Sequence, residues 1–198
     1  LGERLAQVED EVLQTVGHQF MLNSTQQLAE VLFNELRLPK TKRTKTGYST
    51  DASVLENLKV MINEGHAEGA DPRANQVLDG ILEYRELAKL KSTYVDAIPH
   101  YVTNETGRVH TSLNQTIAAT GRLSSTSPNF QNVPVRTETG REVRKAFVPQ
   151  EKDWVILSAD YSQVELRIMA HYSQEPELIK AFEKDADIHR RTAALVNG

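Results

Sequence analysis

The sequence predicts an α+β fold, with a helical first half and a second half that mixes strands with helices. Apolar residues recur at helical spacing from Leu1 to Val16, and the same spacing returns several times before residue 92. Beyond Pro99 the pattern changes to the alternation that is typical of a strand, over residues 109–113. The run at residues 154–157 is almost wholly apolar and predicts a buried strand. We therefore place a boundary near residue 100 and expect two parts, 1–100 and 101–198.

The composition is that of an ordinary soluble globular protein. Hydrophobic residues make up 39% and charged residues 25% of the 198 residues. The absence of cysteine excludes a disulfide framework and a thiolate metal site. No apolar run reaches transmembrane length, and the first residues form a charged amphipathic stretch unlike a signal peptide. We therefore expect a cytoplasmic protein with no membrane partner.

Helix start and stop signals divide the first part of the chain. The helix over residues 1–16 is expected to stop at Gly17. A capping box at Ser24 opens a second helix, and a third is expected from about residue 51 to 62. An Asp-Pro pair then opens a long helix over residues 71–92.

Cations cluster between the second and third of these helices. Five of them follow one another without an acid: Arg37, Lys40, Lys42, Arg43 and Lys45. The net charge of −4 argues against a uniformly basic nucleic-acid binder, so this cluster is a local feature. Charge alone leaves a solvated surface loop and a phosphate-binding loop equally open.

Two further cations lie on the long predicted helix. Arg85 and Lys89 are four residues apart, so they share a face of the helix, where like charges repel modestly unless an anion lies between them. A solvated face is the common explanation for such a pair, and anion binding is the alternative.

Residues 114–134 are polar and have few helix formers. Two prolines keep this segment extended and irregular, and in most proteins it would be a connection. Residues 142–148 are expected to lead into a strand, ahead of the strand at 154–157. A helix is expected over residues 175–183, and Asp187 opens another.

Asp160 lies where the strand predicted at residues 154–157 ends and a helix that includes Val164 begins. The carboxyl ends of strands often carry chemistry, because the strand fixes the side chain while its end faces a cleft. A helix N-cap is the commoner role of an aspartate at such a junction. A ribonuclease-H-like or phosphoryl-acceptor site is a further alternative, but it needs more carboxylates than the sequence places in a recognisable arrangement.

Two longer strings favour catalysis at Asp160. The first string is Asp160-Tyr161-Ser162-Gln163-Val164-Glu165-Leu166-Arg167, and the second is Ala118-Ala119-Thr120-Gly121-Arg122-Leu123-Ser124-Ser125-Thr126-Ser127-Pro128-Asn129-Phe130-Gln131-Asn132-Val133-Pro134-Val135-Arg136-Thr137. Their order and spacing resemble motifs of the family A DNA polymerases, of the bacterial DNA polymerase I type, and the similarity runs from about Phe20 to Val196. The resemblance implies a helical thumb, followed by the first part of a palm with an antiparallel sheet and flanking helices.

The resemblance also implies the roles of the residues around Asp160. Asp160 is expected to bridge two Mg²⁺ ions, with the backbone carbonyl of Tyr161 as a further ligand; Mg²⁺ prefers such oxygen ligands. Glu165 is expected to exclude a ribose 2′-hydroxyl, and Gln163 to shape the nucleotide pocket. His189 is expected to contact the incoming deoxynucleoside triphosphate.

The same resemblance implies contacts to a primer–template duplex. The expected thumb contacts are Lys40, Lys42, Arg43, Lys45, Arg85 and Lys89. The expected contacts on the minor-groove side are Asn114, Gln115, Arg122, Asn129, Gln131 and Asn132. Acceptors in the minor groove are nearly the same for all base pairs, so these side chains could check pair geometry without reading sequence.

The expected function is DNA-templated DNA polymerisation in DNA replication and repair, by nucleotidyl transfer to a primer 3′-hydroxyl. The sequence lacks the family's His-Asp-Glu tripeptide, which carries the second catalytic aspartate, and the Tyr-Gly of its fingers helix. Arg141 and Lys145 have the fingers spacing, but Pro149 follows, so that match is coincidental. We therefore expect a fragment of a monomeric enzyme, inactive by itself. The alternative is a duplex-binding module without activity.

Overall fold

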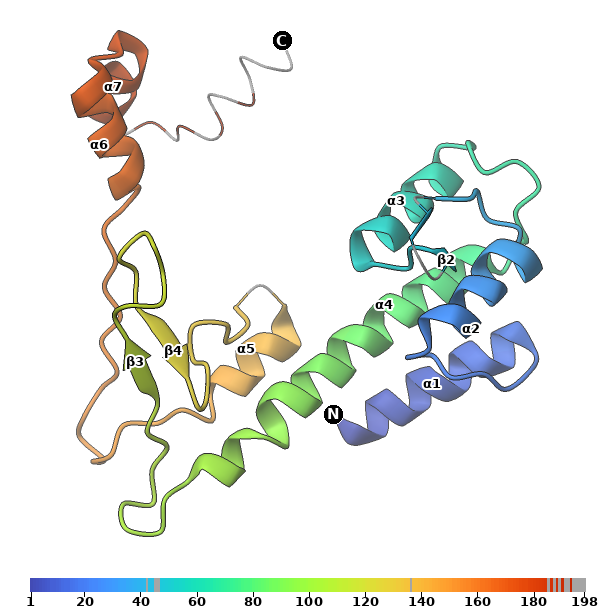
Figure 1. Cartoon of the computed structure of the whole chain (residues 1–198), viewed down its shortest axis with the longest axis horizontal. Coiled ribbons are helices and arrows are strands. Elements are labelled where there is room, and N and C mark those ends of the chain that lie inside the picture. Colours follow the sequence, from blue (N-terminus) through green and yellow to red (C-terminus); the bar gives the residue numbers. More distant parts are fainter. Residues whose placement is uncertain are drawn as a thin grey trace. The chain divides into compact units, whose positions relative to one another are not determined.

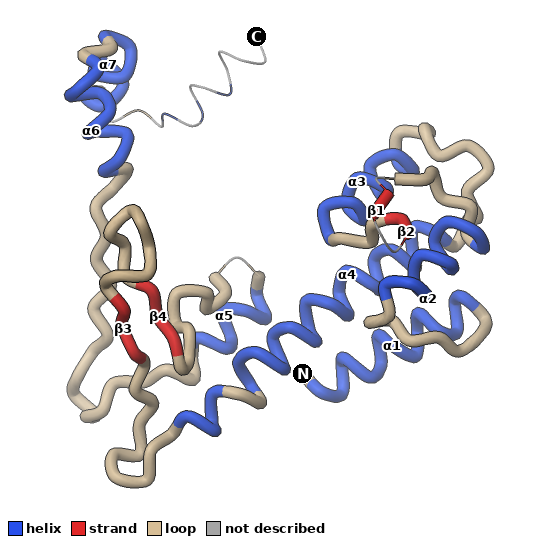
Figure 2. The backbone as a smooth tube through the Cα atoms, viewed as in Figure 1, coloured by secondary structure: helices blue, strands red, loops and turns tan. Residues whose placement is uncertain are grey.

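The computed structural model describes residues 1–41, 43–44, 47–135 and 137–184, together with residues 186, 188, 190 and 193. The chain divides into two compact units, Leu1–Phe147 and Val148–Gly198, and each is described by itself. Helices and two small antiparallel sheets make up the fold (Figure 1 and Figure 2), which confirms the predicted α+β class. The boundary near residue 100 stays a prediction, since the first compact unit continues to Phe147.

Two helices lying side by side form the centre of the first unit, α1 (Gly2–Val16) and α4 (Ala74–Leu90) (Figure 1). α1 ends at Gly17, whose φ of 95° lies in the left-handed region that glycine tolerates. The N–H of Gly17 donates to the carbonyl of Leu13, which closes the helix end. The predicted first helix and its stop are thereby confirmed.

Arg73 ties the ends of these two helices together. Its Nη1 donates to the carbonyls of Thr15 and Val16 at 3.0 and 3.2 Å, which the last turn of α1 leaves without helical partners. Its Nε and Nη2 donate to the two carboxylate oxygens of Asp71, each at 2.9 Å. These hydrogen bonds lower the pKa of Asp71 to about 2.

Two more helices complete the helical core, α2 (Thr25–Glu30) and α3 (Ala52–Asn63). Ser24 caps α2 by accepting from the N–H of Gln27 at 3.4 Å, as the capping box predicted. α2 continues through the π-helical turn η1 (Val31–Glu35), and α4 continues through the π-helical turn η2 (Lys91–Val95) and the 3₁₀ turn η3 (Ile98–Tyr101).

The core of the first unit is aliphatic and comes from these helices and the segments that join them. Its largest fully buried side chains are Val8, Val12, Leu22, Leu28, Val31, Leu32, Leu36, Leu55, Leu58, Val77, Leu78 and Ile81. The helical periodicity in the sequence marked most of these positions, because an amphipathic helix buries the face on which its apolar residues recur.

The strands form two hairpins. β1 (Arg43–Thr44) pairs antiparallel with β2 (Gly47–Tyr48), and β3 (Ser112–Asn114) pairs antiparallel with β4 (Ser124–Thr126). In the second hairpin Leu113 lies opposite Ser125. The strand predicted over residues 109–113 is therefore shifted towards its end, and Val109 makes only an isolated bridge.

Two predicted strands are wrong. Residues 142–148 were expected to lead into a strand, but residues 142–144 end α5 (Glu138–Arg144) and residues 145–148 belong to no strand. Thr137 caps α5 by accepting from the N–H of Gly140 at 3.2 Å. Residues 154–157 belong to no strand, and Trp154 and Leu157 are 60% and 87% exposed. An apolar run becomes a strand only beside a partner, and none of the strands in the described residues pairs with this one.

The second unit holds α6 (Val164–Ser173) and α7 (Pro176–Glu183), which pack against each other (Figure 1). Both helices were predicted. The helix predicted from Asp187 falls where only Ile188, Arg190 and Ala193 are described. Within the described ranges, no helix has the length and apolar character to cross a membrane.

Candidate nucleic-acid interface

The basic loop, residues 40–48, is closed at its base by contacts between its two ends. The Thr41 hydroxyl donates to the carbonyl of Ser49 at 3.3 Å. Lys40 Nζ lies 5.6 Å from the ring centroid of Tyr48, a cation–π distance. Tyr48 also packs on Phe33 of η1, with ring centroids 5.2 Å apart. These contacts tie the hairpin β1–β2 to the helical core.

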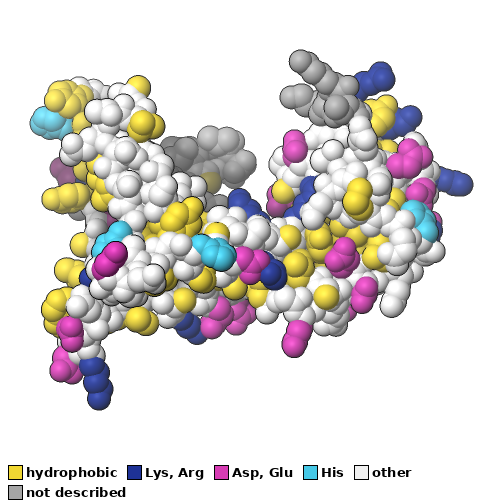
Figure 3. Space-filling model, turned by 60° about the horizontal axis from the view of Figure 1, so that its bottom comes forward, with side chains coloured by type: hydrophobic (Ala, Val, Ile, Leu, Met, Phe, Trp, Pro, Cys, Tyr) yellow, Lys and Arg dark blue, Asp and Glu magenta, His cyan; other side chains and the backbone are white. Residues whose placement is uncertain are grey.

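Of the four cations predicted to bind DNA from this loop, the structure describes two. Lys40 and Arg43 are both exposed, Arg43 on β1, whereas Lys42 and Lys45 lie outside the described residues. On the face drawn in Figure 3, Lys and Arg side chains are interspersed with Asp and Glu, in keeping with the net charge of −4. A duplex would therefore contact individual cations of the loop and not a broad basic surface.

Arg85 and Lys89 share a face of α4 but differ in their surroundings. The Arg85 guanidinium donates to the carbonyl oxygen of Thr50 and, at 3.2 Å, to its Oγ1. Burial lowers the pKa of Arg85 and the nearby Asp51 carboxylate raises it, while an arginine stays protonated throughout the ordinary pH range. Lys89 is exposed. The two cations predicted as equivalent are therefore placed differently.

In the irregular segment, Gln131 is bonded to the chain's own backbone. Its Nε2 donates to the carbonyl of Leu123 at 2.7 Å, and its Oε1 accepts from the N–H of Ser125 at 3.0 Å. The side-chain amide of Gln131 thereby holds Leu123, which follows Arg122, and Ser125 of β4 in place. A contact between Gln131 and a duplex stays a prediction.

Two more of the predicted duplex contacts also bond within the chain. Asn114 Nδ2 donates to Oγ1 of Thr126 at 3.1 Å and to the carbonyl of Ser124 at 3.3 Å, across the β3–β4 pair. Asn129 Oδ1 accepts from the N–H of Gln131 at 2.9 Å. Gln115 and Arg122 are exposed between β3 and β4.

A groove of about 530 Å³ brings Lys89 together with Gln131 and Asn132. It lies between the end of α4 and the segment 131–137. Tyr94 lines it and donates its hydroxyl to the carbonyl of Asn132, which links the helical elements to this segment. Sequence reasoning missed the role of Tyr94; its spacing from the buried Leu87 and Leu90 was the signal that it faces inward.

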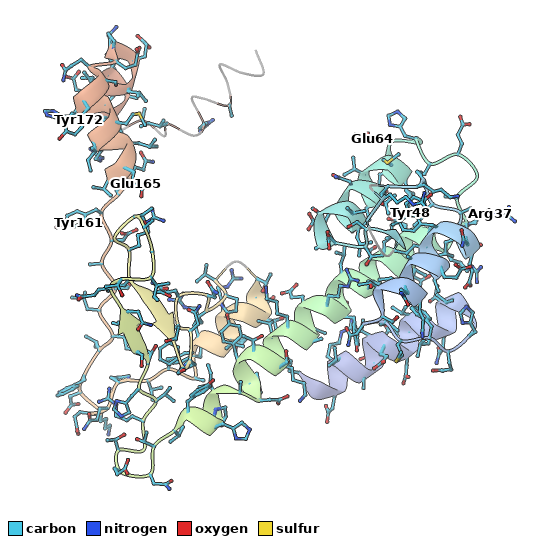
Figure 4. The ribbon with its side chains drawn as sticks, viewed as in Figure 1. Arg37, Tyr48, Glu64, Tyr161, Glu165 and Tyr172 are labelled. Carbon is cyan, nitrogen blue, oxygen red and sulfur yellow. The ribbon has the colours of Figure 1, made fainter. Side chains whose placement is uncertain are left out.

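In the second unit, Asp160 and Tyr161 are exposed on the segment before α6. Figure 4 shows Tyr161 extending from this segment and Glu165 projecting from the first turn of the helix. The N-cap of α6 is Gln163, so the common alternative role of Asp160 as N-cap does not apply. Gln163 has a φ of 52°, a left-handed conformation that costs a non-glycine residue about 1 kcal/mol.

Arg167 fixes the backbone between Asp160 and α6. Its Nε donates to the carbonyl of Ser162 at 3.0 Å. Its Cζ lies 4.5 Å from the ring centroid of Phe182 on α7, so the guanidinium is held by a second element.

The oxygen donors at this place fit part of a magnesium site. Mg²⁺ takes carboxylate and carbonyl oxygens, which Asp160 and the backbone of Tyr161 supply. Within the described ranges, no three His, Cys, Asp or Glu side chains group as metal ligands. His189, the predicted triphosphate contact, lies outside the described residues.

Comparison with known proteins identifies the family of this chain. The family model described as "DNA polymerase family A" matches residues 1–198. The chain belongs to DNA polymerase family A.

The relatives extend this family assignment over the whole chain. The DNA polymerase I of Synechocystis sp. is 48% identical over 200 residues, covering 100% of this chain and 19% of the relative. That of Bacillus subtilis is 47% identical over 98% of this chain and 20% of the relative, and the thermostable enzyme of Thermus aquaticus is 47% identical over 100% and 22%. The chain therefore spans about a fifth of the length of the curated relatives it matches.

A solved structure is similar as well. It is the POL domain of Pol1 from M. smegmatis in complex with DNA primer-template and dNTP, 44% identical, with a TM-score of 0.78. The match covers 95% of this chain and 31% of that one.

In this family A polymerase chain, many of the predicted site residues fall into three groups, apart from those on and between β3 and β4. The basic loop and Arg85 form one, the groove with Lys89 and Asn132 forms the second, and the segment around Asp160 forms the third. The first two groups lie in the first compact unit and the third in the second unit.

Proposed function

We propose that this chain is part of an enzyme that performs DNA-templated DNA polymerisation. One observation carries the proposal: proteins named DNA polymerase I match it at 47–48% identity over at least 98% of its length. The complex of the similar Pol1 domain supports primer–template DNA and deoxynucleoside triphosphates as the partners of this chain.

In the proposed reaction, the primer 3′-hydroxyl attacks the α-phosphate of the triphosphate, and pyrophosphate leaves. Bound Mg²⁺ would lower the pKa of that hydroxyl and neutralise charge on the leaving group. Asp160 and the carbonyl of Tyr161 would hold two such ions. Gln163 would shape the nucleotide pocket, Glu165 would exclude a 2′-hydroxyl, and His189 would contact the triphosphate.

We assign residues 1–100 to a thumb that holds the duplex and residues 101–198 to the first part of a palm. The described cations Lys40, Arg43 and Lys89 support the first assignment, since duplex affinity comes largely from contacts between cations and phosphates. We place the enzyme in DNA replication and repair, in the cytoplasm and as a monomer.

A second candidate function is a duplex-binding module with no activity of its own. The sequence contains no His-Asp-Glu tripeptide, which carries the family's second catalytic aspartate, and this favours the module for these 198 residues, because Mg²⁺ keeps most of its water and one carboxylate is too little to position two ions. The two candidates differ in whether the remaining catalytic groups are present.

We expect these 198 residues to bind duplex DNA weakly and to leave a primer unextended. If about four cations meet phosphates, the logarithm of the affinity should fall with the logarithm of the salt concentration at a slope of roughly −3 to −4. Sequence preference should be slight, because phosphate contacts carry no base information. Titration of a labelled primer–template at several salt concentrations, beside an extension assay, measures both.

Clear primer extension would show that the catalytic groups in these residues suffice. Salt-independent binding, or no binding at low salt, would contradict the thumb assignment. A single-stranded oligonucleotide of the same sequence serves as the control for duplex preference.

In the complete enzyme, Glu165→Ala should raise the incorporation of ribonucleotides relative to deoxyribonucleotides. Removal of the carboxylate opens the space in which the 2′-hydroxyl would lie. A competition assay with matched ribo- and deoxyribonucleoside triphosphates measures the ratio. Unchanged sugar selectivity would leave Glu165 as an ordinary residue in the first turn of α6.

A further inference from the structure

Arg85 donates hydrogen bonds to Thr50, whereas Lys89 on the same helix is exposed. We propose that Arg85 is a positioning residue, which holds the base of the basic loop at Thr50 against α4, so that the described loop cations Lys40 and Arg43 can meet a duplex. This inference rests on the proposed function, because the ligand of the loop is taken to be DNA. It differs from a direct contact between Arg85 and a phosphate.

The base of the loop, Ser49 and Thr50, is buried. Ser49 and Thr50 are 6% and 4% exposed, and together with Ser125 they are the buried polar residues of the described part of the chain. A buried polar group without a partner is costly, so each of these residues needs one. Arg85 supplies two hydrogen bonds to Thr50, one to the backbone carbonyl and one to the hydroxyl.

Ser49, in the loop base, also connects to residues on both sides of the loop, Thr41 and Asp51. The carbonyl of Ser49 accepts from Thr41 at 3.3 Å, and the Ser49 hydroxyl donates to Asp51 Oδ2 at 2.8 Å. Asp51 attracts Arg85 electrostatically and is also the N-cap of α3. Arg85 therefore joins the loop base to α4, while the base is joined to α3 and to the far end of the loop.

The geometry of the Arg85 guanidinium suits its two acceptors on Thr50. A guanidinium presents several N–H groups in a fixed fork, so one side chain can reach both oxygens of Thr50, whereas a lysine ammonium is a point charge on a flexible stem. Lys89, one turn further along α4, carries the same charge and is exposed. It is the matched control for a cation that acts by charge alone.

A loop that is held in place loses less conformational freedom when it binds. Ordering the backbone of one residue costs about as much as a ten-fold change in affinity, so release of the loop should weaken duplex binding about ten-fold or more. Arg85→Lys keeps the charge and removes the fork. Thr50→Val removes the hydroxyl acceptor and leaves the arginine in place.

The experiment compares wild type, Arg85→Lys, Thr50→Val and Lys89→Ala in the full 198-residue chain. Amide hydrogen exchange over residues 47–51 without DNA reports whether the loop is held. Titration with a labelled primer–template reports affinity and salt slope. Lys40→Ala is added to each background, so that the cost of losing a loop cation is measured with and without Arg85.

We expect Arg85→Lys to lose amide protection at the loop base and to bind the duplex about ten-fold more weakly. Thr50→Val should weaken binding several-fold, and the cost of Lys40→Ala should shrink in both backgrounds. Lys89→Ala should keep the loop protected, lower the salt slope by about 0.9, and leave the cost of Lys40→Ala unchanged.

The inference is overturned if Arg85→Lys binds like wild type, or if Thr50→Val binds as well as wild type because it frees Arg85 for a phosphate. It is overturned equally if the effects of Arg85→Lys and Lys40→Ala simply add. Failure of the wild-type chain to bind a duplex at low salt would instead contradict the proposed function, and the exchange measurement would still show whether Arg85 holds the loop.

Discussion

Replacing Gly80 with alanine should lower the free energy of unfolding of the helical core by about 1–3 kcal/mol, the usual cost of overpacking. A Cβ at Gly80 would lie 2.4 Å from Cγ2 of Val12, which is closer than a real Cβ atom comes to a neighbouring heavy atom. Val12 is only 2% exposed, so it has little space into which to move. Alanine favours the helix by up to about 1 kcal/mol over glycine, but this gain is smaller than the clash between α1 and α4.

Urea denaturation followed by far-ultraviolet circular dichroism measures this change, because α1 and α4 supply much of the helix. The single tryptophan is unsuitable as a probe, since Trp154 is exposed and belongs to the second unit. Val12→Ala provides the control: in that background the clash is gone, so Gly80→Ala should become neutral or stabilising. Equal destabilisation in both backgrounds would contradict the close contact between the helices.

The helices of the first unit could be predicted because their signals are local. Gly17 ends α1 and Ser24 opens α2, and each acts on a backbone group within four residues. The long helix was expected to reach residue 92, and α4 ends at Leu90 with a π-helical turn beyond it. Helix ends commonly fray into such turns, so a difference of two residues at the helix end is small.

The strands could not be predicted in the same way because pairing is not local. Residues 154–157 have the composition of a buried strand, and they belong to no strand in the described chain. Residues 138–144 have a cap and a helical first turn, and these local signals formed α5, although residues 142–148 were expected to lead into a strand. Composition predicts whether a segment favours a strand, and the strand forms only where a neighbouring strand pairs with it.

The candidate site was predicted as a set of residues, and the structure adds which of them are engaged. Arg85 and Gln131 both carry donors that suit DNA, and both bond to backbone atoms that lie 35 and 8 residues away. A sequence gives no information about such a partner, because the distance along the chain bears no relation to the distance in space. The exposed Lys89 and the engaged Arg85 share a helix face, so the helical pattern gives the same expectation for both.

In the complete enzyme, Asp160→Asn should lower turnover by on the order of a thousand-fold or more. Metal ions stabilise the transition state of such reactions by several kcal/mol, and each 1.4 kcal/mol is a factor of ten. An amide is neutral and binds Mg²⁺ far less well than a carboxylate, so the variant would lose most of this stabilisation. Single-turnover incorporation of one nucleotide measures the effect without interference from product release.

The affinity of the same Asp160→Asn variant for primer–template should stay within a few-fold of wild type, because the cations proposed to bind the duplex lie in the first compact unit. This separation of turnover from affinity distinguishes a metal ligand from a residue that merely supports the fold. Asp153→Asn is the matched control: Asp153 is exposed seven residues earlier, in the turn before the apolar run, and has no assigned role. Its turnover should equal that of wild type. Near-normal incorporation by Asp160→Asn would remove the metal-ligand role, and an equal loss in Asp153→Asn would point to disruption of the segment rather than to the chemistry of one carboxylate.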